Sequence, residues 1–389
     1  MNISILFFKY HSMNQARTTT HETGKTERLY SLDALRGFDM FWIMGAEEIA
    51  HALYKATGSP VAGAVSRQLT HPEWNGFALY DLIFPLFLFL AGVATPYSVG
   101  RELEQGKSKQ QLWLRVFKRS MILVALGIFY NNGLAHLTPF NEIRFPSVLG
   151  RIGLAYLFAN IIYLYSGHRA QAGWFLGLMT GYWLLLKCTA APGFAPGDLT
   201  IEGNFASYID RLIIPGRLHR GIHDPEGLFS TIPAIGTGLL GIMAGTLLKS
   251  GVQNKQQKAL YLALTGLVCM LIAEIWNLDF PINKNLWSSS FVLLAGGVSL
   301  LLLSLFYYII DVLGYRKWAF FFKVIGMNSI LIYISDKFID WEYSAKAVTG
   351  WLAELSGEAF YPVVIALGYV ALKWIFLRIL YERKIFLKV

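Results

Sequence analysis

The sequence predicts an all-α, polytopic membrane protein, and three observations support this fold class. Of the 389 residues, 54% are hydrophobic and 15% are charged, whereas a soluble domain carries about 25% charged residues. The mean hydropathy is +0.44. Apolar runs of about 20 residues, the length that a helix needs to cross the hydrocarbon core, recur along the chain. We therefore expect most of the apolar surface to face lipid.

About ten such runs are predicted to be membrane spans. They cover 32–52, 77–99, 120–131, 148–165, 174–190, 228–248, 260–276, 289–312, 319–338 and 359–380, and the third borrows part of its basic flank, 112–119. Lys and Arg are concentrated in alternate connecting segments, so the positive-inside rule predicts that both termini are cytoplasmic. The chain then divides into a cytoplasmic tail, 1–30, and a transmembrane domain, 31–389.

The charge distribution argues against a nucleic-acid-binding protein, and the cysteine usage argues against a protein built on disulfides or a metal site. The net charge of +9 lies between hydrophobic runs, which is typical of a membrane protein and does not predict nucleic-acid binding. The two cysteines, Cys188 and Cys269, both fall inside apolar runs and indicate neither a disulfide framework nor a metal site.

The first predicted span contains ionisable side chains, which are costly in a bilayer and face a cavity or a partner. Asp33 and Arg36 are three residues apart on one helix face. They form either a structural ion pair or part of a cofactor site that grips a phosphate. Glu47 and Glu48 lie at the outer end of the same run.

A first outer stretch places His71, Trp74 and Asn75 just before a span, with Asp81 about two helical turns further on. Histidine accepts and returns a proton near neutral pH, so His71 is a candidate catalytic residue. The alternative is an interfacial histidine beside a tryptophan of the aromatic belt.

A second outer stretch, 208–234, is crowded with Arg, His, Asp and Glu, including Asp224 and Glu226. Such a loop suits a hydroxyl-rich or amino-bearing ligand, or it is a solvated loop closed by ion pairs. His219 and His223 are four residues apart, but the Pro and Gly around them argue against a helical metal site.

A third outer stretch lies at the start of a later span and contains Asn283, Lys284, Asn285 and Trp287. Amide groups and a flat aromatic face are what a sugar site needs. The same residues are also typical of an interfacial helix cap.

Several long motifs follow one another along nearly the whole predicted membrane region. They are "RLYSLDALRGF" from Arg28, "HPEWNGFALYDLIFPLFLF", "RFPSVLGRIGLAYLF", "YIDRL", "HDPEG", "PINKNLWSSSF", "IGMNSILIY" and "RKIFLKV". With these motifs the chain resembles the heparan-α-glucosaminide N-acetyltransferase family and its shorter bacterial relatives. The opening "LDALRG" also looks like the start of the wider class of transmembrane acyltransferases.

The resemblance implies an enzyme that takes acetyl-CoA in the cytoplasm and acetylates a terminal glucosamine or related amino sugar on the outer side. His71 matches the family's active-site histidine, which precedes a "WNG" element. The family's first-span asparagine aligns with Glu47 or Glu48 instead. The luminal domain that precedes the membrane region in the lysosomal enzyme is not expected here, so the acceptor need not be heparan.

The resemblance also suggests a mechanism. Only a neutral amine attacks a thioester, so His71 acts either as a general base or as an acetyl carrier. Arg115, Lys118 and Arg119 are candidates for holding the phosphates of acetyl-CoA, or they are ordinary positive-inside anchors. Arg151 is predicted to enter the bilayer from outside, and we expect it to line the tunnel or to brace the His71 loop.

The main alternative is a membrane transporter that moves a small solute without changing it. For the enzyme, the expected partners are acetyl-CoA, a glycan acceptor and the lipid bilayer. A homodimer is a candidate assembly by resemblance, and neither metal nor nucleic acid is expected. The expected location is a bacterial inner membrane, with the active-site loops on the periplasmic side.

Overall fold

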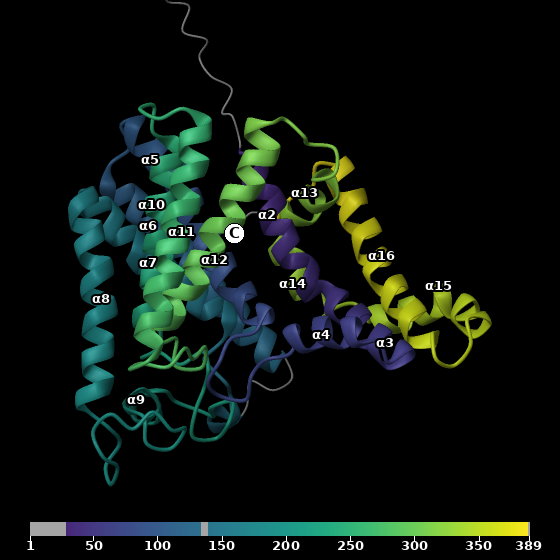
Figure 1. Cartoon of the computed structure of the whole chain (residues 1–389), viewed down its shortest axis with the longest axis horizontal. Coiled ribbons are helices and arrows are strands. Elements are labelled where there is room, and N and C mark those ends of the chain that lie inside the picture. The colour runs from purple at the N-terminus through teal and green to yellow at the C-terminus, as the bar shows by residue number, and fades with distance from the viewer. Residues whose placement is uncertain (1–28, 134–138, 388–389) are drawn as a thin grey trace, which may run out of the picture.

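The structure is a computed structural model that describes residues 29–133 and 139–387, and within these ranges every regular element is helical (Figure 1). One isolated β-bridge joins Arg144 to Gly216. The prediction of an all-α architecture is therefore confirmed for the described residues. The predicted cytoplasmic tail, 1–30, lies almost entirely outside them.

Six helical segments within the described ranges are long and apolar enough to cross a membrane. They are η2 (Leu79–Leu82) continued by α5 (Ile83–Glu104), α7 (Val148–Tyr165), α10 (Thr231–Lys249), α11 (Lys255–Asn277), α12 (Ser289–Tyr307) continued by η4 (Tyr308–Val312), and α16 (Tyr361–Glu382). Each coincides with a predicted span. The total of about ten stays a prediction.

Three of the other four predicted spans also fall on helical segments. The third run belongs to one continuous helix, α6 (Lys109–Asn132), which includes the basic flank as expected, and the fifth belongs to α8 (His168–Cys188). The first run is divided into α2 (Tyr30–Phe41), the π-helix η1 (Trp42–Ala46) and α3 (Glu47–Thr57). The break is at Gly45, whose φ of 122° is accessible to glycine and strained for other residues.

The expectation of one continuous helix over 319–338 is wrong. Two short helices, α13 (Phe320–Gly326) and α14 (Ser329–Ser335), replace it, and neither is long enough to cross the hydrocarbon core alone. Asn328 separates them, and its side-chain amide is used elsewhere. It donates to the Ile385 carbonyl at 2.9 Å and accepts from the Leu387 amide at 3.0 Å.

The connecting segments that carry the predicted site gather at one end of the long helices. Figure 1 shows α8, α10 and α11 roughly upright and α12 tilted beside them, with α3 and α4 (Pro60–Gln68) to the right, below α2 and α14. The loops around α9 (Phe205–Ile213) lie at the same end, and α15 (Trp341–Leu355) lies beside α16. A short turn, η3 (Phe140–Glu142), precedes α7.

Helices pack closely where glycine removes the side chain. A Cβ built on Gly241 of α10 would lie 2.1 Å from the Phe89 carbonyl of α5. A Cβ on Gly37 of α2 would lie 1.7 Å from the Phe322 carbonyl of α13. Small residues allow this backbone approach between membrane helices.

Replacing Gly37 by alanine is expected to destabilise the fold by about 1–3 kcal/mol, the usual cost of overpacking, because α2 and α13 must separate. The midpoint of thermal unfolding in detergent measures this. Gly177→Ala is the matched control, because nothing lies within 4 Å of a Cβ built on that exposed residue of α8. Equal midpoints for the two variants would contradict the close-packing argument.

Candidate active site

The three outer stretches meet at one cavity of about 320 Å³. His71, Trp74 and Asp81 line it from the first stretch, Glu226 from the second, and Lys284 and Asn285 from the third. Tyr130, Asn131, Arg144 and Tyr333 complete a polar and aromatic wall. The fold therefore brings together residues that are as far apart as 71 and 333 in the chain.

His71 is oriented by a buried carboxylate. Its Nδ1 lies 2.7 Å from Asp81 Oδ1, and the other oxygen of Asp81 accepts the Ala78 amide at 3.0 Å. Asp81 is 1% exposed, whereas the His71 side chain is 47% exposed. A carboxylate that accepts from Nδ1–H leaves the lone pair on Nε2, which is the nitrogen available for proton or acyl transfer.

Lys284 contacts both members of this pair. Its ammonium lies 3.1 Å from His71 Nε2 and 3.4 Å from Asp81 Oδ1. Burial lowers the pKa of Lys284, against the opposing effect of the Asp81 carboxylate. The site therefore places the His71 imidazole, the buried Asp81 carboxylate and the Lys284 ammonium in direct contact with one another.

Arg144 clamps the second stretch, and sequence reasoning missed it. Its guanidinium donates two hydrogen bonds of 2.8 Å to the carboxylate of Asp224 and a third to Glu226. Burial disfavours the guanidinium charge, but Asp224 and Glu226 outweigh it and raise the pKa of Arg144. Asp224 is fully buried, so it supports the loop, whereas Glu226 lines the cavity. Of the two interpretations of the second stretch, a ligand-binding loop or a loop closed by ion pairs, Asp224 therefore fits the second.

In the third stretch, the prediction that Trp287 offers its face to a ligand is wrong. Its side chain is 0% exposed, because it packs against Phe84 and Phe291 in the core. Asn283 is also buried, and it donates to the Asn75 side chain at 3.0 Å, which joins the third stretch to the first.

Trp74 is held at the cavity wall by the loop that precedes α9. Its indole NH donates to the Leu199 carbonyl at 2.9 Å, and its ring meets His223 edge to face. This contact with protein explains its half-buried position.

The two glutamates of the first run differ in position. Glu47 accepts a 3.3 Å hydrogen bond from the hydroxyl of Tyr80, whose ring lies 4.8 Å from that of His71. Glu48 is exposed on α3 and lines neither this cavity nor the next. Of the two glutamates, Glu47 is therefore the one that contacts a neighbour of His71.

A second cavity, of about 430 Å³, contains three of the predicted cofactor-binding residues: Asp33, Arg36 and Arg119. Arg36 lies 3.5 Å from Asp33, and Arg119 lies over the ring of Tyr156. The remaining candidates are elsewhere. Arg115 and Lys118 are exposed, with Arg115 paired to Glu102.

Arg151 lines neither of these two cavities, and it is almost completely buried. It donates to the Gly227 carbonyl at 3.0 Å and to the Ser230 hydroxyl, and it lies over the ring of Trp287. It therefore braces the segment that leads into α10, and not the His71 loop.

The two cavities follow the same helices. Arg119 and Tyr130 on α6 are eleven residues apart, which corresponds to about 16 Å along the helix axis. On α14, Ile330 lines the second cavity and Tyr333 lines the first. Tyr130 and Tyr333 stack with ring centroids 4.5 Å apart, so an aromatic pair stands at the inner wall of the His71 cavity.

His223 predicts a pH dependence of stability. It is buried beside Ser207, with Nδ1 2.7 Å from the hydroxyl, and burial lowers its pKa from 6.5 to about 4. Protonation therefore favours the unfolded chain. The stabilisation is complete above pH 6.5 and is lost as the pH falls towards 4, by up to about 3 kcal/mol. His223→Gln should flatten this decline when unfolding midpoints are compared between pH 7 and 4.

A neighbouring group acts in the opposite sense. Burial raises the pKa of Asp210 to about 6, so its contribution grows as the pH falls. The difference between His223→Gln and the parent, and not the parent's own profile, is therefore the quantity to compare. Parallel profiles for the two proteins would contradict the assignment to His223.

Comparisons with known proteins connect this geometry to a chemistry. Residues 28–166 match a family described as a domain of unknown function, DUF5009. The heparan-alpha-glucosaminide N-acetyltransferase of Mus musculus is 28% identical over 378 aligned residues, covering 82% of this chain and 56% of the mouse protein. The Homo sapiens enzyme is 29% identical over 323 aligned residues, covering 69% of this chain and 48% of the human protein.

The chain thus spans about half the length of the curated relatives it matches. The similarity covers 82% of this chain for the mouse protein and 69% for the human protein. It confirms the resemblance indicated by the sequence motifs, since this chain is similar to the curated heparan-alpha-glucosaminide N-acetyltransferases over most of its length.

Proposed function

We propose that the chain is a transmembrane acetyltransferase. It moves an acetyl group from cytoplasmic acetyl-CoA to the amino group of a terminal glucosamine or related amino sugar on the outer side of a bacterial inner membrane. The observation that carries the proposal is the contact of His71 with Asp81 and Lys284 at a polar cavity, in a chain similar to N-acetyltransferases.

The second cavity is the proposed site for the nucleotide part of acetyl-CoA. Arg36 and Arg119 supply cationic groups that suit phosphate. The pantetheine arm would extend along α6 and α14, past Tyr130 and Tyr333, so that the thioester reaches His71. Arg115 and Lys118 lie outside this cavity and are proposed to act as membrane-surface anchors.

Two chemical routes use the same residues. In the first, His71 Nε2 takes a proton from the sugar ammonium, and the neutral amine attacks the thioester carbonyl. The C–N bond forms, the C–S bond breaks, and CoA leaves as a thiolate that is then protonated. In the second, Nε2 itself attacks the thioester carbonyl, the C–S bond breaks, and CoA leaves as a thiolate that takes a proton from the sugar ammonium. The neutral amine then attacks the acetyl group, the bond from the acetyl carbon to Nε2 breaks, and the remaining proton of the attacking nitrogen passes to solvent.

Asp81 and Lys284 have distinct roles in both routes. Asp81 holds Nδ1–H and stabilises the imidazolium that forms on the ring. The Lys284 ammonium is close enough to stabilise the oxyanion that develops on the thioester carbonyl. Glu226 and Asn285 face the same cavity and suit the hydroxyl and amino groups of a sugar.

Purified protein supplied with isotopically labelled acetyl-CoA and glucosamine tests the proposal. We expect CoA release that depends on glucosamine, with labelled N-acetylglucosamine detected by mass spectrometry. A protein that binds no acetyl-CoA and instead carries unmodified glucosamine across proteoliposome membranes would be a transporter, and the proposal would be overturned.

A further inference from the structure

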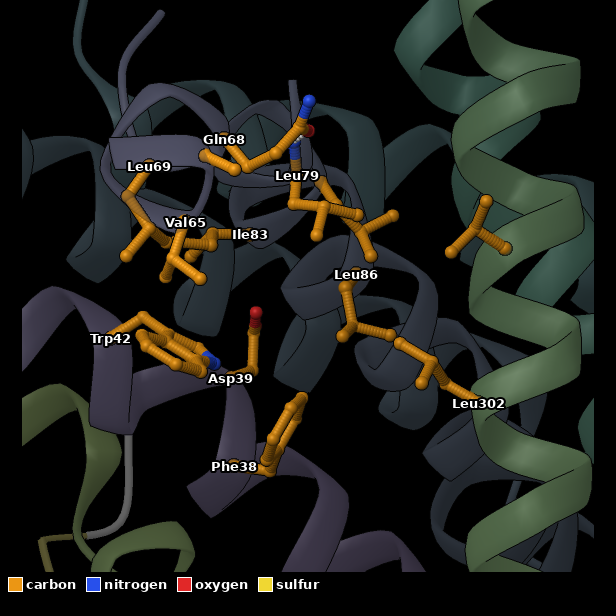
Figure 2. A pocket seen from close by; sticks show the side chains of 13 residues that line it. Phe38, Asp39, Trp42, Val65, Gln68, Leu69, Leu79, Ile83, Leu86 and Leu302 are labelled. Atoms are coloured by element: carbon orange, nitrogen blue, oxygen red, sulfur yellow. Dashed lines mark hydrogen bonds between the residues drawn. The ribbon is translucent and has the colours of Figure 1, made fainter. Parts of the chain in front are cut away.

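A third cavity, of about 430 Å³, lies between α2, α4, α5 and α12, and shares no lining residue with the two cavities described above. Its wall is apolar and includes Trp42, Val65, Ile83 and Leu302 (Figure 2). This volume lies within the usual range of small-molecule sites.

One acidic side chain interrupts this apolar wall. Among the described residues that line the cavity, Asp39 is the only charged one, and it is 2% exposed. Figure 2 shows its carboxyl directed towards the centre of the cavity, between Trp42 and Leu86. Asp39 Oδ2 has no hydrogen-bond partner in the described part of the chain. Gln68, the other polar residue of the lining, uses its side-chain oxygen to accept the Leu79 amide at 3.1 Å.

A carboxylate in this position needs a partner. Burying an ionised group without compensation is costly, and an acid within a membrane helix marks a binding or transport site by default. Arg36, one helical turn before Asp39, acts on it electrostatically, but its guanidinium lies 3.5 Å from Asp33 and lines the second cavity. Inside the third cavity, the ligand that complements a single acid in an apolar wall is a cation attached to an apolar body.

We propose that the third cavity binds a single-chain lipophilic amine. Its alkyl chain occupies the apolar space, and its ammonium donates a hydrogen bond to Asp39. The exposed side chains of Val65 and Leu79 at the rim offer an apolar entrance. One segment, 69–81, separates the third cavity from the first. Leu69 and Leu79 line the third cavity, whereas His71 and Asp81 line the first. The proposal does not depend on acetyl transfer.

The test uses the full chain in phosphatidylcholine nanodiscs and dodecylamine with a photoreactive diazirine in its alkyl chain. Mass spectrometry should locate the cross-links on peptides that contain Trp42, Val65 or Leu302. Asp39→Asn should weaken binding by about tenfold or more, because the ammonium then donates to a neutral amide oxygen in place of a charged carboxylate. Dodecanol, which has the same chain length and no charge, should compete about tenfold more weakly than unlabelled dodecylamine.

A matched pair of variants tests the cavity without changing Asp39. Leu302→Trp fills the cavity and should abolish labelling, whereas Leu305→Trp, at an exposed position of α12 outside the lining, should retain it. This pair decides the question even if Asp39→Asn does not fold. Labelling spread over the lipid-facing helices and unchanged in Leu302→Trp would mean simple partition into the bilayer. Either that outcome or parental affinity in folded Asp39→Asn would overturn the proposal.

Discussion

Replacing His71 by alanine is expected to lower the rate of acetyl transfer to glucosamine by about 10²–10⁴-fold, the contribution usual for a positioned acid–base group. The effect follows from geometry, because His71 lines the cavity with Nδ1 held by Asp81 and Nε2 beside the Lys284 ammonium. The His71 side chain is 47% exposed, so its removal should leave the unfolding midpoint nearly unchanged. Glucosamine-dependent CoA release, measured at saturating acetyl-CoA, gives the rate.

Two further variants separate catalysis from general disturbance. His168→Ala removes an exposed histidine at the start of α8 and should retain parental activity. Asp81→Asn keeps the size of the side chain but offers Nδ1–H only a neutral oxygen, so its rate should fall between those of the parent and His71→Ala. Parental activity in folded His71→Ala would remove this residue from the mechanism.

The residues of the His71 cluster are visible in the sequence, but their contacts are not. A histidine and an acid ten residues apart, before a span, were enough to mark the first stretch as a candidate site. Their direct contact depends on a local turn that composition does not specify. Gly76, at a φ of 120°, donates its amide to the Ile282 carbonyl at 2.8 Å. The contact of His71 with Lys284 joins residues 213 positions apart, and no local pattern contains that information.

Trp287 shows why local chemistry is ambiguous near span ends. A tryptophan next to polar residues is equally typical of a membrane interface, a sugar platform and a packed core. The structure places it in the core, where Thr237 on α10 accepts its indole NH at 3.2 Å. Arg144 was overlooked for the related reason that its partners are Asp224 and Glu226, about 80 residues later in the chain.

Arg144→Met is expected to destabilise the protein by about 3–5 kcal/mol, because it leaves the buried carboxylate of Asp224 without its cation. The unfolding midpoint in detergent should fall accordingly. Arg115→Met is the matched control. It breaks an exposed ion pair with Glu102, for which a change of under about 1 kcal/mol is expected. Similar losses in the two variants would contradict a special role for the Arg144 clamp.

A double variant distinguishes the worth of the ion pair from the cost of an orphaned charge. If the unpaired carboxylate causes the loss, then Arg144→Met combined with Asp224→Asn should be more stable than Arg144→Met alone. Acetyl transfer should not recover in parallel, because Glu226, which faces the His71 cavity, still lacks the guanidinium that positions it. Recovery of activity together with stability would show instead that the clamp supports the fold and contributes nothing to the geometry of the site.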